Sequence, residues 1–327
     1  MPLSGRRVVV TGGAGFIGRH VVRQLLNAGA RVTVPLHEGD RVTVAGAEGR
    51  PLTVEGLTLV DADLRESSGA EQALAGADYV VHLAARSGGV QLQHSPSADL
   101  FEANVAMTRQ VLSAAAACGV RRCYLASSAV IYASDAGPVL DEAAHTVEPW
   151  RETVTPYAWS KLTDEATATW WQEAGLDVVV GRFTNVFGAG ATFDPARSTV
   201  VHALVKKAVD AAPGGVVEVW GDGSAVRSFI HVRDAASGVL TVLTRGRAGT
   251  PYNISSDEPV TIRSLAEAVR DAVDPSLRLE FNPSRPAGPA RRVLDTSRLA
   301  SLGFRPRVSL EDGVCDVVAS YRATRGE

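Results

Sequence analysis

A glycine pattern close to the N-terminus constrains the fold of this chain more than any other feature. The segment T-G-G-A-G-F-I-G, residues 11–18, directly follows the apolar run 6–10 and precedes a stretch with helical periodicity. Gly12, Gly15 and Gly18 have the G-x-x-G-x-x-G spacing, which permits a tight turn, close approach of the backbone to a pyrophosphate, and close packing of helix on strand. The N–H groups and dipole at the helix start would hold the phosphates. The sequence thus predicts a dinucleotide-binding unit.

The rest of the chain alternates short apolar runs with helical stretches, which is typical of a parallel, doubly wound α/β sheet. After residue 182 this alternation loosens, and Gly/Pro-rich loops become frequent. We therefore expect a Rossmann-type dinucleotide-binding domain at 1–182 and a smaller C-terminal substrate-binding lobe at 183–327, some segments of which return to the first domain. The expected strands are 6–10, 31–35, 57–61, 78–83, 121–127 and 177–182, with helices near 16–28, 68–75, 97–118 and 156–174 and a surface connection at 37–56.

Composition is that of a globular enzyme rather than of a nucleic-acid or membrane protein. The 327 residues are 45% hydrophobic and 21% charged, with a net charge of −3, so the chain has no basic footprint for nucleic acid. No apolar run approaches the ~20 residues that span a bilayer. Cys118, Cys123 and Cys315 lack metal-ligand spacing, so we expect no metal site and a reducing, cytoplasmic setting.

A tyrosine and a lysine in the run P-Y-A-W-S-K, residues 156–161, indicate proton-transfer chemistry. Tyr157 and Lys161 are four residues apart and share one face of a helix. The ammonium can lower the pKa of the phenol from about 10, so that the phenol exchanges a proton with a sugar or alcohol hydroxyl near neutral pH. Y-x-x-x-K is common in helices, and its weight here comes from the dinucleotide fingerprint in the same chain.

Further motifs follow the fingerprint in a fixed order. They are D-A-D-L (61–64), H-L-A-A (82–85), S-S-A-V-I-Y (127–132), Y-A-W-S-K (157–161), R-F-T-N-V-F-G (182–188) and W-G-D-G-S-A-V-R-S-F-I-H-V-R-D (220–234). Over essentially its whole length the chain resembles the extended short-chain dehydrogenase/reductases of the nucleotide-sugar epimerase/dehydratase family. The resemblance implies an NAD or NADP cofactor and a nucleotide-diphosphate sugar as substrate. It also implies a homodimer formed through the helices at 97–118 and 156–174.

The resemblance assigns a catalytic role to Ser128, Tyr157 and Lys161. The Ser128 hydroxyl would bind the reacting sugar oxygen and orient it toward Tyr157, whereas Lys161 would also hold the nicotinamide ribose. Asp63 would bond the adenine, which Leu64 would flank. The implied cofactor-binding residues are Gly12, Gly15, Phe16, Ile17, Gly18, His37, Asp63, Leu64, Ala84, Tyr157 and Lys161.

The choice between NAD and NADP stays open at this level. The second strand of such folds usually ends in an acidic residue that binds the adenine ribose and selects NAD. Here V-T-V-P-L-H places Leu36 or His37 at that point. His37 or Arg41 could pair with a 2′-phosphate, which favours NADP, while Glu38 or Asp40 could still reach the ribose.

By the same resemblance, the second lobe would hold the substrate diphosphate. Asn185 and Arg227 match family residues that contact it, and the guanidinium fork suits a phosphate. Arg285 lies ten residues before Asp295, the spacing of another phosphate-binding arginine, with Arg291 and Arg292 as competitors. Asn104 is expected to link its helix to nearby backbone rather than to contact a ligand.

Departures from the family pattern narrow the reaction. Family 4,6-dehydratases carry an acidic pair where this chain has Ala129-Val130, so dehydration is disfavoured, as is decarboxylation. Relatives that epimerise at C3 and C5 need a Cys at this place and a His or Lys near Thr199. Thr199 is kept as a substrate-binding candidate, and His202 as a more remote substitute for the missing base.

Chemistry at the sugar C4 then needs only Ser, Tyr, Lys and hydride. We expect a nucleotide-sugar 4-epimerase, slightly ahead of an NADPH-dependent reductase of a nucleotide-linked 4-keto-6-deoxy sugar. A dinucleotide-binding sensor without turnover is the alternative of another class, and the presence of all three catalytic residues speaks against it. A hydroxysteroid or dihydroflavonol-type reductase is disfavoured because Arg227 and Asn185 would have no diphosphate to pair with.

Overall fold

The architecture comes from a computed structural model of the chain. Most of the surface connection expected at 37–56 lies outside the described residues, together with Glu38, Asp40 and Arg41. The structure describes residues 3–37, 54–86, 98–133, 136–144, 146–147, 155–195, 197–285, 288 and 290–326.

The centre of the fold is a seven-stranded sheet in which all neighbouring strands are parallel. In sheet order its strands are β11 (Pro251–Ile254), β7 (Val178–Phe183), β5 (Arg122–Ser128), β4 (Tyr79–His82), β1 (Arg7–Thr11), β2 (Arg31–Leu36) and β3 (Leu57–Asp61). From β1 the chain adds β2 and β3 on one side, and then β4, β5 and β7 on the other side, so the order of strands reverses between β1 and β4. Ligands of such sheets bind beyond the carboxyl ends of the strands at this point. The predicted doubly wound α/β fold is confirmed.

The edge strand β11 comes from the later half of the sequence. It pairs with β7 so that Asn253 lies opposite Arg182. A segment after residue 182 thus contributes directly to the central sheet, while the division of the chain at that residue stays a prediction.

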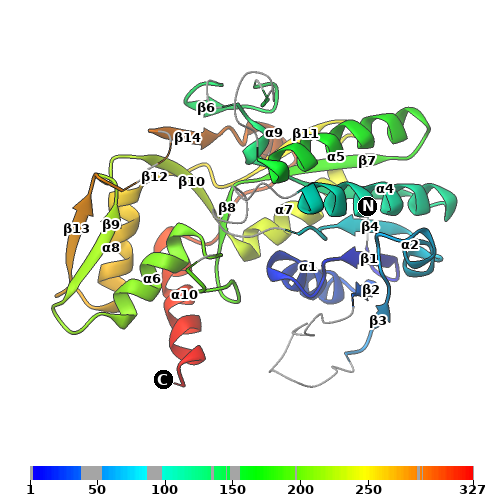
Figure 1. Cartoon of the computed structure of the whole chain (residues 1–327). Helices are drawn as coiled ribbons and strands as arrows, with labels where there is room; N and C mark the ends of the chain where they lie inside the picture. The colour runs from blue at the N-terminus through cyan, green and yellow to red at the C-terminus, as the bar shows by residue number, and fades with distance from the viewer. Residues whose placement is uncertain are drawn as a thin grey trace.

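Helices cover both faces of the sheet, because successive side chains of a strand point to opposite faces. Val8 and Val10 of β1 belong to the same core cluster as Val21, whereas Val9 belongs to another cluster with Val111. On the first face α1 (Phe16–Asn27) packs against α7 (Val232–Arg245), and on the second α4 (Ala98–Ala117) packs between α2 (Ser67–Leu74) and α5 (Pro156–Glu173) (Figure 1).

The later part of the chain builds a smaller mixed lobe with its own core. Val201, Leu265 and Val317, from three different helices, are fully or almost fully buried in it. Figure 1 shows this lobe on the left, with its strands and helices beside the central sheet. Its elements are β8 (Asn185–Phe187), α6 (Val200–Asp210), β9 (Val216–Trp220), β10 (Val226–His231), β12 (Pro259–Thr261), α8 (Ile262–Val273), β13 (Arg278–Asn282), β14 (Arg291–Leu294) and α10 (Leu310–Thr324). The short helix α9 (Ser297–Ser301) instead packs against β11 of the central sheet.

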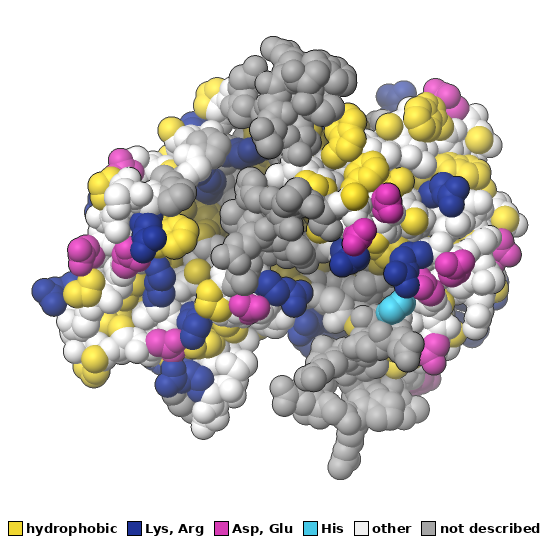
Figure 2. Space-filling model, in the orientation of Figure 1, with side chains coloured by type: hydrophobic (Ala, Val, Ile, Leu, Met, Phe, Trp, Pro, Cys, Tyr) yellow, Lys and Arg dark blue, Asp and Glu magenta, His cyan; other side chains and the backbone are white. Residues whose placement is uncertain are grey.

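Two small sheets organise this lobe. Strand β10 pairs with β12, β14 and β8, and β14 also pairs with β6 (Val139–Leu140) from the first half of the chain. Strands β9 and β13 form a separate parallel pair. On the face shown in Figure 2, positive and negative side chains are interspersed over both parts of the molecule.

Candidate active site

The glycine-rich turn between β1 and α1 has the geometry that a bound dinucleotide requires. Gly12 has φ +67°, and a Cβ on it would lie 2.8 Å from the backbone nitrogen of Ala84. A Cβ on Gly18 would overlap the Gly12 carbonyl. Gly15 is the residue directly before α1. It has no side chain that could accept hydrogen bonds from the first-turn N–H groups of the helix, which begin at Phe16. These groups are therefore available to phosphate oxygens, and the residues present fit the cofactor.

The H-L-A-A segment is bonded to the fingerprint through a buried histidine. His82 Nδ1 lies 2.7 Å from Thr11 Oγ1, and the Ala84 N–H donates to the same hydroxyl (3.2 Å). Burial, with a contribution from Lys161, lowers the pKa of His82 to about 3, so the imidazole is neutral. Ala84 is thus held beside Gly12, as its predicted place near the cofactor requires.

Three polar side chains meet where β2 and β3 end, at the predicted adenine-ribose position. Asp63 accepts hydrogen bonds from the Arg65 backbone N–H and Nε (both 2.9 Å), and His37 Nε2 lies 3.6 Å from Asp63 Oδ2. The hydrogen bonds from Arg65 lower the pKa of Asp63 to about 2. Arg65 was missed from the sequence, although its position two residues after Asp63 could have signalled it. Leu64, predicted to flank the adenine, is buried in the sheet core.

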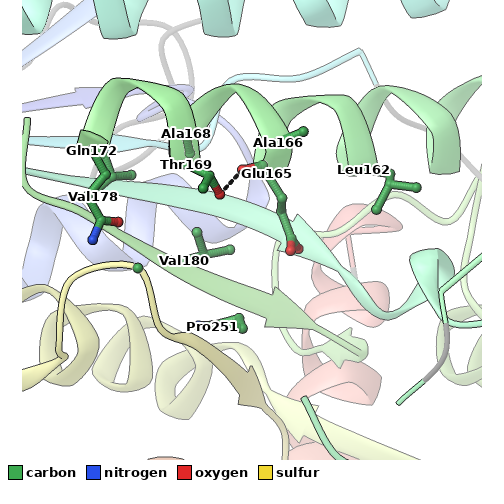
Figure 3. Close-up of a pocket in the computed structure, with 10 residues that line it drawn as sticks. Leu162, Glu165, Ala166, Ala168, Thr169, Gln172, Val178, Val180 and Pro251 are labelled. Atoms are coloured by element: carbon green, nitrogen blue, oxygen red, sulfur yellow. Dashed lines mark hydrogen bonds between the residues drawn. The ribbon is translucent and has the colours of Figure 1, made fainter. Parts of the chain in front are cut away.

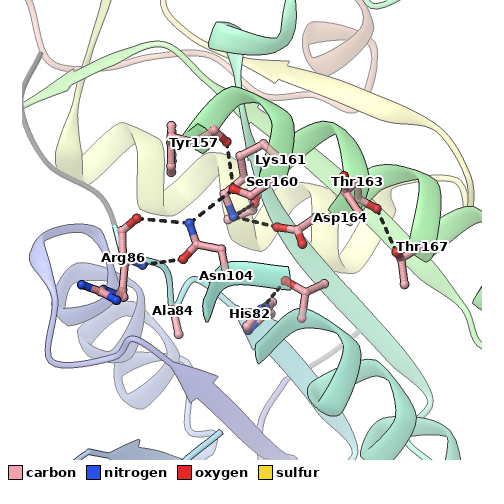
Figure 4. A network of polar contacts seen from close by, with 12 residues as sticks. His82, Ala84, Arg86, Asn104, Tyr157, Ser160, Lys161, Thr163, Asp164 and Thr167 are labelled. Carbon is pink, nitrogen blue, oxygen red and sulfur yellow. Dashed lines mark hydrogen bonds and ion pairs between the residues drawn. The ribbon is translucent and has the colours of Figure 1, made fainter. Parts of the chain in front are cut away.

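Helix α5 presents Tyr157 and Lys161 in its first turns. Thr155 caps the helix by accepting from the Ala158 N–H (3.2 Å), and Pro156 begins it. The Lys161 Nζ lies 6.0 Å from the centre of the Tyr157 ring (Figure 4). The same ammonium donates to the Ala126 carbonyl of β5 and to Asp164 Oδ2, both at 3.1 Å.

The pKa of Tyr157 differs from the sequence expectation. Burial raises the pKa of this phenol, Lys161 opposes the rise, and the Asp164 carboxylate adds to it. Lys161 thus acts in the predicted direction but is outweighed. For Lys161, burial acts to lower the pKa, but the charges of Asp164 and Tyr157 outweigh it. The net pKa of Lys161 is therefore raised, and the ammonium stays charged.

Ser128 lies at the carboxyl end of β5, directly before the short 3-10 turn η1 (Ala129–Ile131). Its Oγ accepts weakly from the Val130 N–H at 3.4 Å, and its side chain is partly exposed. Helix α5 packs against both β5 and η1, which brings the helix that carries Tyr157 to this strand end. The neighbouring Ser127 is buried and has no hydrogen-bond partner among the described residues.

Asn104 of α4 forms the helix-to-backbone link expected for it. Its Oδ1 accepts from the Arg86 N–H (2.7 Å), and its Nδ2 donates to the Arg86 carbonyl (3.2 Å) and to Ser160 Oγ (3.3 Å). Asn104 therefore connects the segment after β4 to helix α5 (Figure 4).

In the second lobe, two arginines lie close together next to the Ser128 turn. Burial and the charge of Arg292 lower the pKa of Arg227. Arg292 donates to the carbonyls of Ala129 and Tyr132, both at 2.8 Å. Two neighbouring guanidinium groups favour an anion between them. Arg292, a competitor of Arg285 in the sequence analysis, is thus beside Arg227.

The other predicted substrate residues are bonded within the protein. Asn185 donates to the Ser228 carbonyl at 2.8 Å. Thr199 Oγ1 lies 2.8 Å from Nδ1 of the fully buried His202, whose Nε2 lies 3.0 Å from the Gly188 carbonyl. Because a carbonyl only accepts, Nε2 carries the proton, and the Thr199 hydroxyl donates to Nδ1. His202 is therefore a structural residue of this loop.

Arg285 lies at the β9–β13 pair, where Glu218 and Trp220 surround it. Its Nε is 3.6 Å from Glu218 Oε1, and its guanidinium carbon is 5.5 Å from the centre of the half-exposed Trp220 ring. These contacts lie within the β9–β13 pair, and the phosphate-binding role of Arg285 stays a prediction.

A cavity of about 230 Å³ lies between α5, β7 and the start of β11 (Figure 3). Leu162, Ala166, Val180 and Pro251 supply apolar side chains to its wall, and Glu165 borders it. None of the predicted site residues lines this cavity. It is separate from the constellation around Tyr157.

The parallel sheet, the glycine turn and the Ser–Tyr–Lys set define a nicotinamide-dinucleotide-dependent enzyme with NAD or NADP as cofactor. The family model described as "NAD dependent epimerase/dehydratase family" matches residues 8–255. The chain belongs to this family of nucleotide-sugar enzymes, and the family assignment made from the sequence motifs is confirmed.

Relatives of this chain carry out several reactions. A dTDP-4-dehydro-6-deoxy-D-allose reductase of Streptomyces bikiniensis is 34% identical over 318 residues, 94% of this chain and 95% of the relative. The dTDP-glucose 4,6-dehydratase of Streptomyces venezuelae, solved with NAD and TYD bound, is 31% identical with a TM-score of 0.77 and covers 98% of both chains. The Thermus thermophilus UDP-glucose 4-epimerase, solved with NAD, is 29% identical with a TM-score of 0.76, over 97% of this chain and 99% of its own.

No helix in the described part combines the length and apolar character needed to cross a bilayer. Within the same residues, no group of three His, Cys, Asp or Glu side chains is placed to hold a metal ion.

Proposed function

We propose that the protein is an NAD(P)H-dependent reductase that converts the C4 ketone of a nucleotide-linked 4-keto-6-deoxy hexose to an alcohol. From the sequence alone, this reaction ranks just below 4-epimerisation. Its rank rises because a dTDP-4-dehydro-6-deoxy-D-allose reductase is similar over nearly the full length of both chains.

The observation that carries the proposal is the small set of reactive groups next to Ser128. Ala129 and Val130 offer neither an acid nor a base, which leaves Tyr157 to exchange a proton with substrate. One proton donor is sufficient for ketone reduction, whereas expulsion of a hydroxyl or proton removal from carbon needs a further acid or base.

The proposed mechanism divides the reaction among Ser128, Tyr157 and Lys161. The Ser128 hydroxyl donates a hydrogen bond to the substrate carbonyl oxygen and polarises the C4–O bond. Tyr157 gives its phenolic proton to the same oxygen as the alcohol forms. Lys161 stabilises the phenolate that is left and holds the nicotinamide ribose. A bound reduced dinucleotide supplies the hydride that C4 receives.

Arg227 and Arg292 are the proposed partners of the substrate diphosphate. Both guanidinium groups attract an anion placed near them, and their planar shape matches phosphate oxygens. Arg292 also bonds the backbone on both sides of η1, so a diphosphate held here would lie close to Ser128.

The test is a reduction assay with a set of dTDP-, GDP-, UDP- and CDP-linked 4-keto-6-deoxy sugars. NADPH and NADH are compared by their loss of absorbance, and the product is identified by mass spectrometry. The proposal predicts stoichiometric dinucleotide oxidation with at least one substrate, and oxidation at least about 100-fold slower with Tyr157→Phe. Turnover of a nucleotide sugar without net dinucleotide oxidation would contradict it.

A 4-epimerase is the second candidate, and the similarity to the UDP-glucose 4-epimerase of Thermus thermophilus favours it. Ser128, Tyr157 and Lys161 would serve both half-reactions. This candidate predicts that NAD is retained through purification. It also predicts that nucleotide-linked C4 epimers interconvert without added dinucleotide.

We also propose a cytoplasmic homodimer in which α4 and α5 pair with their copies. Helices α4 and α5 pack side by side, and Trp170 on α5 is 66% exposed, which is unusual for a large apolar side chain. Analytical ultracentrifugation of the wild type and Trp170→Glu tests this arrangement. A dimer is expected for the first and weaker association for the second.

A further inference from the structure

We propose that Asp164 is a positioning residue whose carboxylate neutralises Lys161 and thereby keeps Tyr157 in the protonated form that donates to a ketone. The inference rests on the proposed ketone reduction, and it assigns a role to a residue outside the Ser–Tyr–Lys set.

The contact between Asp164 and Lys161 is buried and direct. The two side chains are 1% and 4% exposed, and Nζ lies 3.1 Å from Oδ2. The residues are three apart on α5 and so share a helix face with Tyr157 (Figure 4). A buried carboxylate next to a buried ammonium cannot exchange its partner for water, so the pairing is a fixed feature of the site.

Asp164 and Ala126 together orient the ammonium. An ammonium has three donors, and Lys161 uses one on the Ala126 carbonyl and one on Asp164. The third donor has no partner among the described residues and is left for a ligand. The carboxylate therefore restricts where Lys161 can direct its remaining hydrogen bond.

The charge balance determines the state of Tyr157. With Asp164 present, the buried set of phenol, ammonium and carboxylate is neutral overall. Ionising the phenol would give this set a net negative charge in a poorly solvated place. Without the carboxylate, the same ionisation would produce a neutral phenolate–ammonium pair. Asp164 thus favours the phenol, which is a proton donor, over the phenolate, which is a base.

The neighbouring groups do not cancel this effect. Burial is the main cause that raises the pKa of Asp164, and the charge of Glu165 on α5 adds to the rise. The Glu165 carboxylate is itself paired with Arg182. His82 of β4 is neutral and contacts Thr108 of α4. Its Nε2 lies 3.1 Å from the Thr108 hydroxyl. The Thr108 hydroxyl also faces Asp164 and opposes the rise in its pKa.

The direction of the pKa of Tyr157 agrees with this geometry. Burial raises it, and Asp164 adds to the rise while Lys161 opposes it. A phenol with a raised pKa is protonated throughout the neutral range, as reduction requires. A base that starts oxidation of an alcohol would need the opposite shift.

The test measures tyrosine ionisation directly and needs no substrate. Ultraviolet difference titration of the ligand-free protein follows tyrosinate formation, and the signal missing in Tyr157→Phe identifies Tyr157. In Asp164→Asn the Tyr157 transition is expected to move down by about one pH unit. Glu173→Gln, which removes an exposed carboxylate from the same helix, is the matched control and should leave the transition in place.

A pH profile of ketone reduction provides a second readout. The loss of activity on the alkaline side should move to lower pH in Asp164→Asn, while the reverse oxidation of the alcohol should gain activity near neutral pH. If Asp164→Asn does not fold, Asp164→Thr keeps an oxygen that can accept from Lys161 and serves in its place.

The outcomes separate this inference from the proposed function. A downward shift of the Tyr157 transition supports the role of Asp164, even if the reductase assay fails and the substrate assignment falls. An unchanged or raised transition overturns it, even if ketone reduction is observed.

Discussion

Helix α5 contributes to two ion pairs in neighbouring positions, one buried and one largely buried, and they differ in how completely they are bonded. Glu165 receives two hydrogen bonds from Arg182, at 3.0 and 2.7 Å, and Arg182 also donates to Tyr132 Oη and the Glu142 carbonyl. Lys161 meets Asp164 through a single hydrogen bond, and its third donor has no partner among the residues that the structure describes.

This difference separates a structural pair from a chemical one. The guanidinium of Arg182 is surrounded by acceptors from α5 and from the segments that follow β5, so it ties these elements together. The ammonium of Lys161 is held less completely, by the Ala126 carbonyl and by Asp164. We therefore expect substitutions at the Arg182 pair to affect mainly stability, and those around Lys161 mainly activity.

The largest effect on activity is expected from Tyr157→Phe. Loss of the proton donor should reduce turnover by roughly 10²–10⁴-fold. The melting temperature should change little, because the phenol oxygen has no hydrogen-bond partner among the described residues. Steady-state kinetics and thermal melting are measured together. An unfolded variant would contradict the distinction between the structural Arg182 pair and the chemical Lys161 pair.

The largest effect on stability is expected from Arg182→Met. Removing one member of a buried pair leaves Glu165 uncompensated and should cost about 3–5 kcal/mol in the free energy of unfolding. Urea denaturation provides the measurement. The double variant Arg182→Met/Glu165→Leu should recover part of the loss, and a single variant as stable as wild type would refute the structural role.

Lys161→Met should destabilise less than Arg182→Met, and in a pH-dependent way. Burial raises the pKa of Asp164, and without Lys161 nothing of opposite charge on α5 opposes this. A raised folded-state pKa of a carboxyl means that stability is present below the unfolded value near 3.8 and is lost as pH rises through the folded value. Unfolding titrations from acid to neutral pH should show this decline, and it should be absent in Lys161→Met/Asp164→Asn.

The smallest effect is expected at the exposed ion pair of Asp63 and Arg65. The pKa of Asp63 is about 2, below the ordinary 3.8, so its contribution is complete above pH 3.8 and is lost as pH falls toward 2. Solvent screens this pair, so Asp63→Asn should change stability little at neutral pH and should flatten the profile only in that acidic window. A large loss of stability at neutral pH would show that exposure does not predict how much an ion pair contributes to the free energy of unfolding.

The order of strands and helices in the first half was predictable because local signals determine it. Val8, Val9 and Val10 lead into a glycine turn, and the apolar spacing of Val21 and Leu25 then marks α1. That some later segments return to the first domain was predicted, but not that β11 is the strand that joins the central sheet. A four-residue run after a long, loosely patterned region carries no information about its partner.

The candidate site was only partly predictable for a related reason. Tyr157 and Lys161 are recognisable because their spacing is fixed by the helix. Arg65 and Asp164 lie only two and three residues from Asp63 and Lys161, so spacing could have indicated those contacts. The burial of Asp164 and the proximity of Arg227 to Arg292, by contrast, depend on which elements pack together. Asp164 in particular looks like an ordinary helix carboxylate until its burial is known.

The late position of β11 in the sequence has a consequence for biosynthesis. Strand β7 can form its final edge pairing only after residues 251–254 have left the ribosome, and Asn253 then bonds Tyr132 Oη (2.6 Å) and the Glu142 side chain (2.8 Å). At about 5–20 residues added per second, the nascent chain spends seconds with the β7 edge unpaired. An exposed strand edge is a template for association, so this interval is when a growing chain is most exposed to misassembly or to capture by a chaperone.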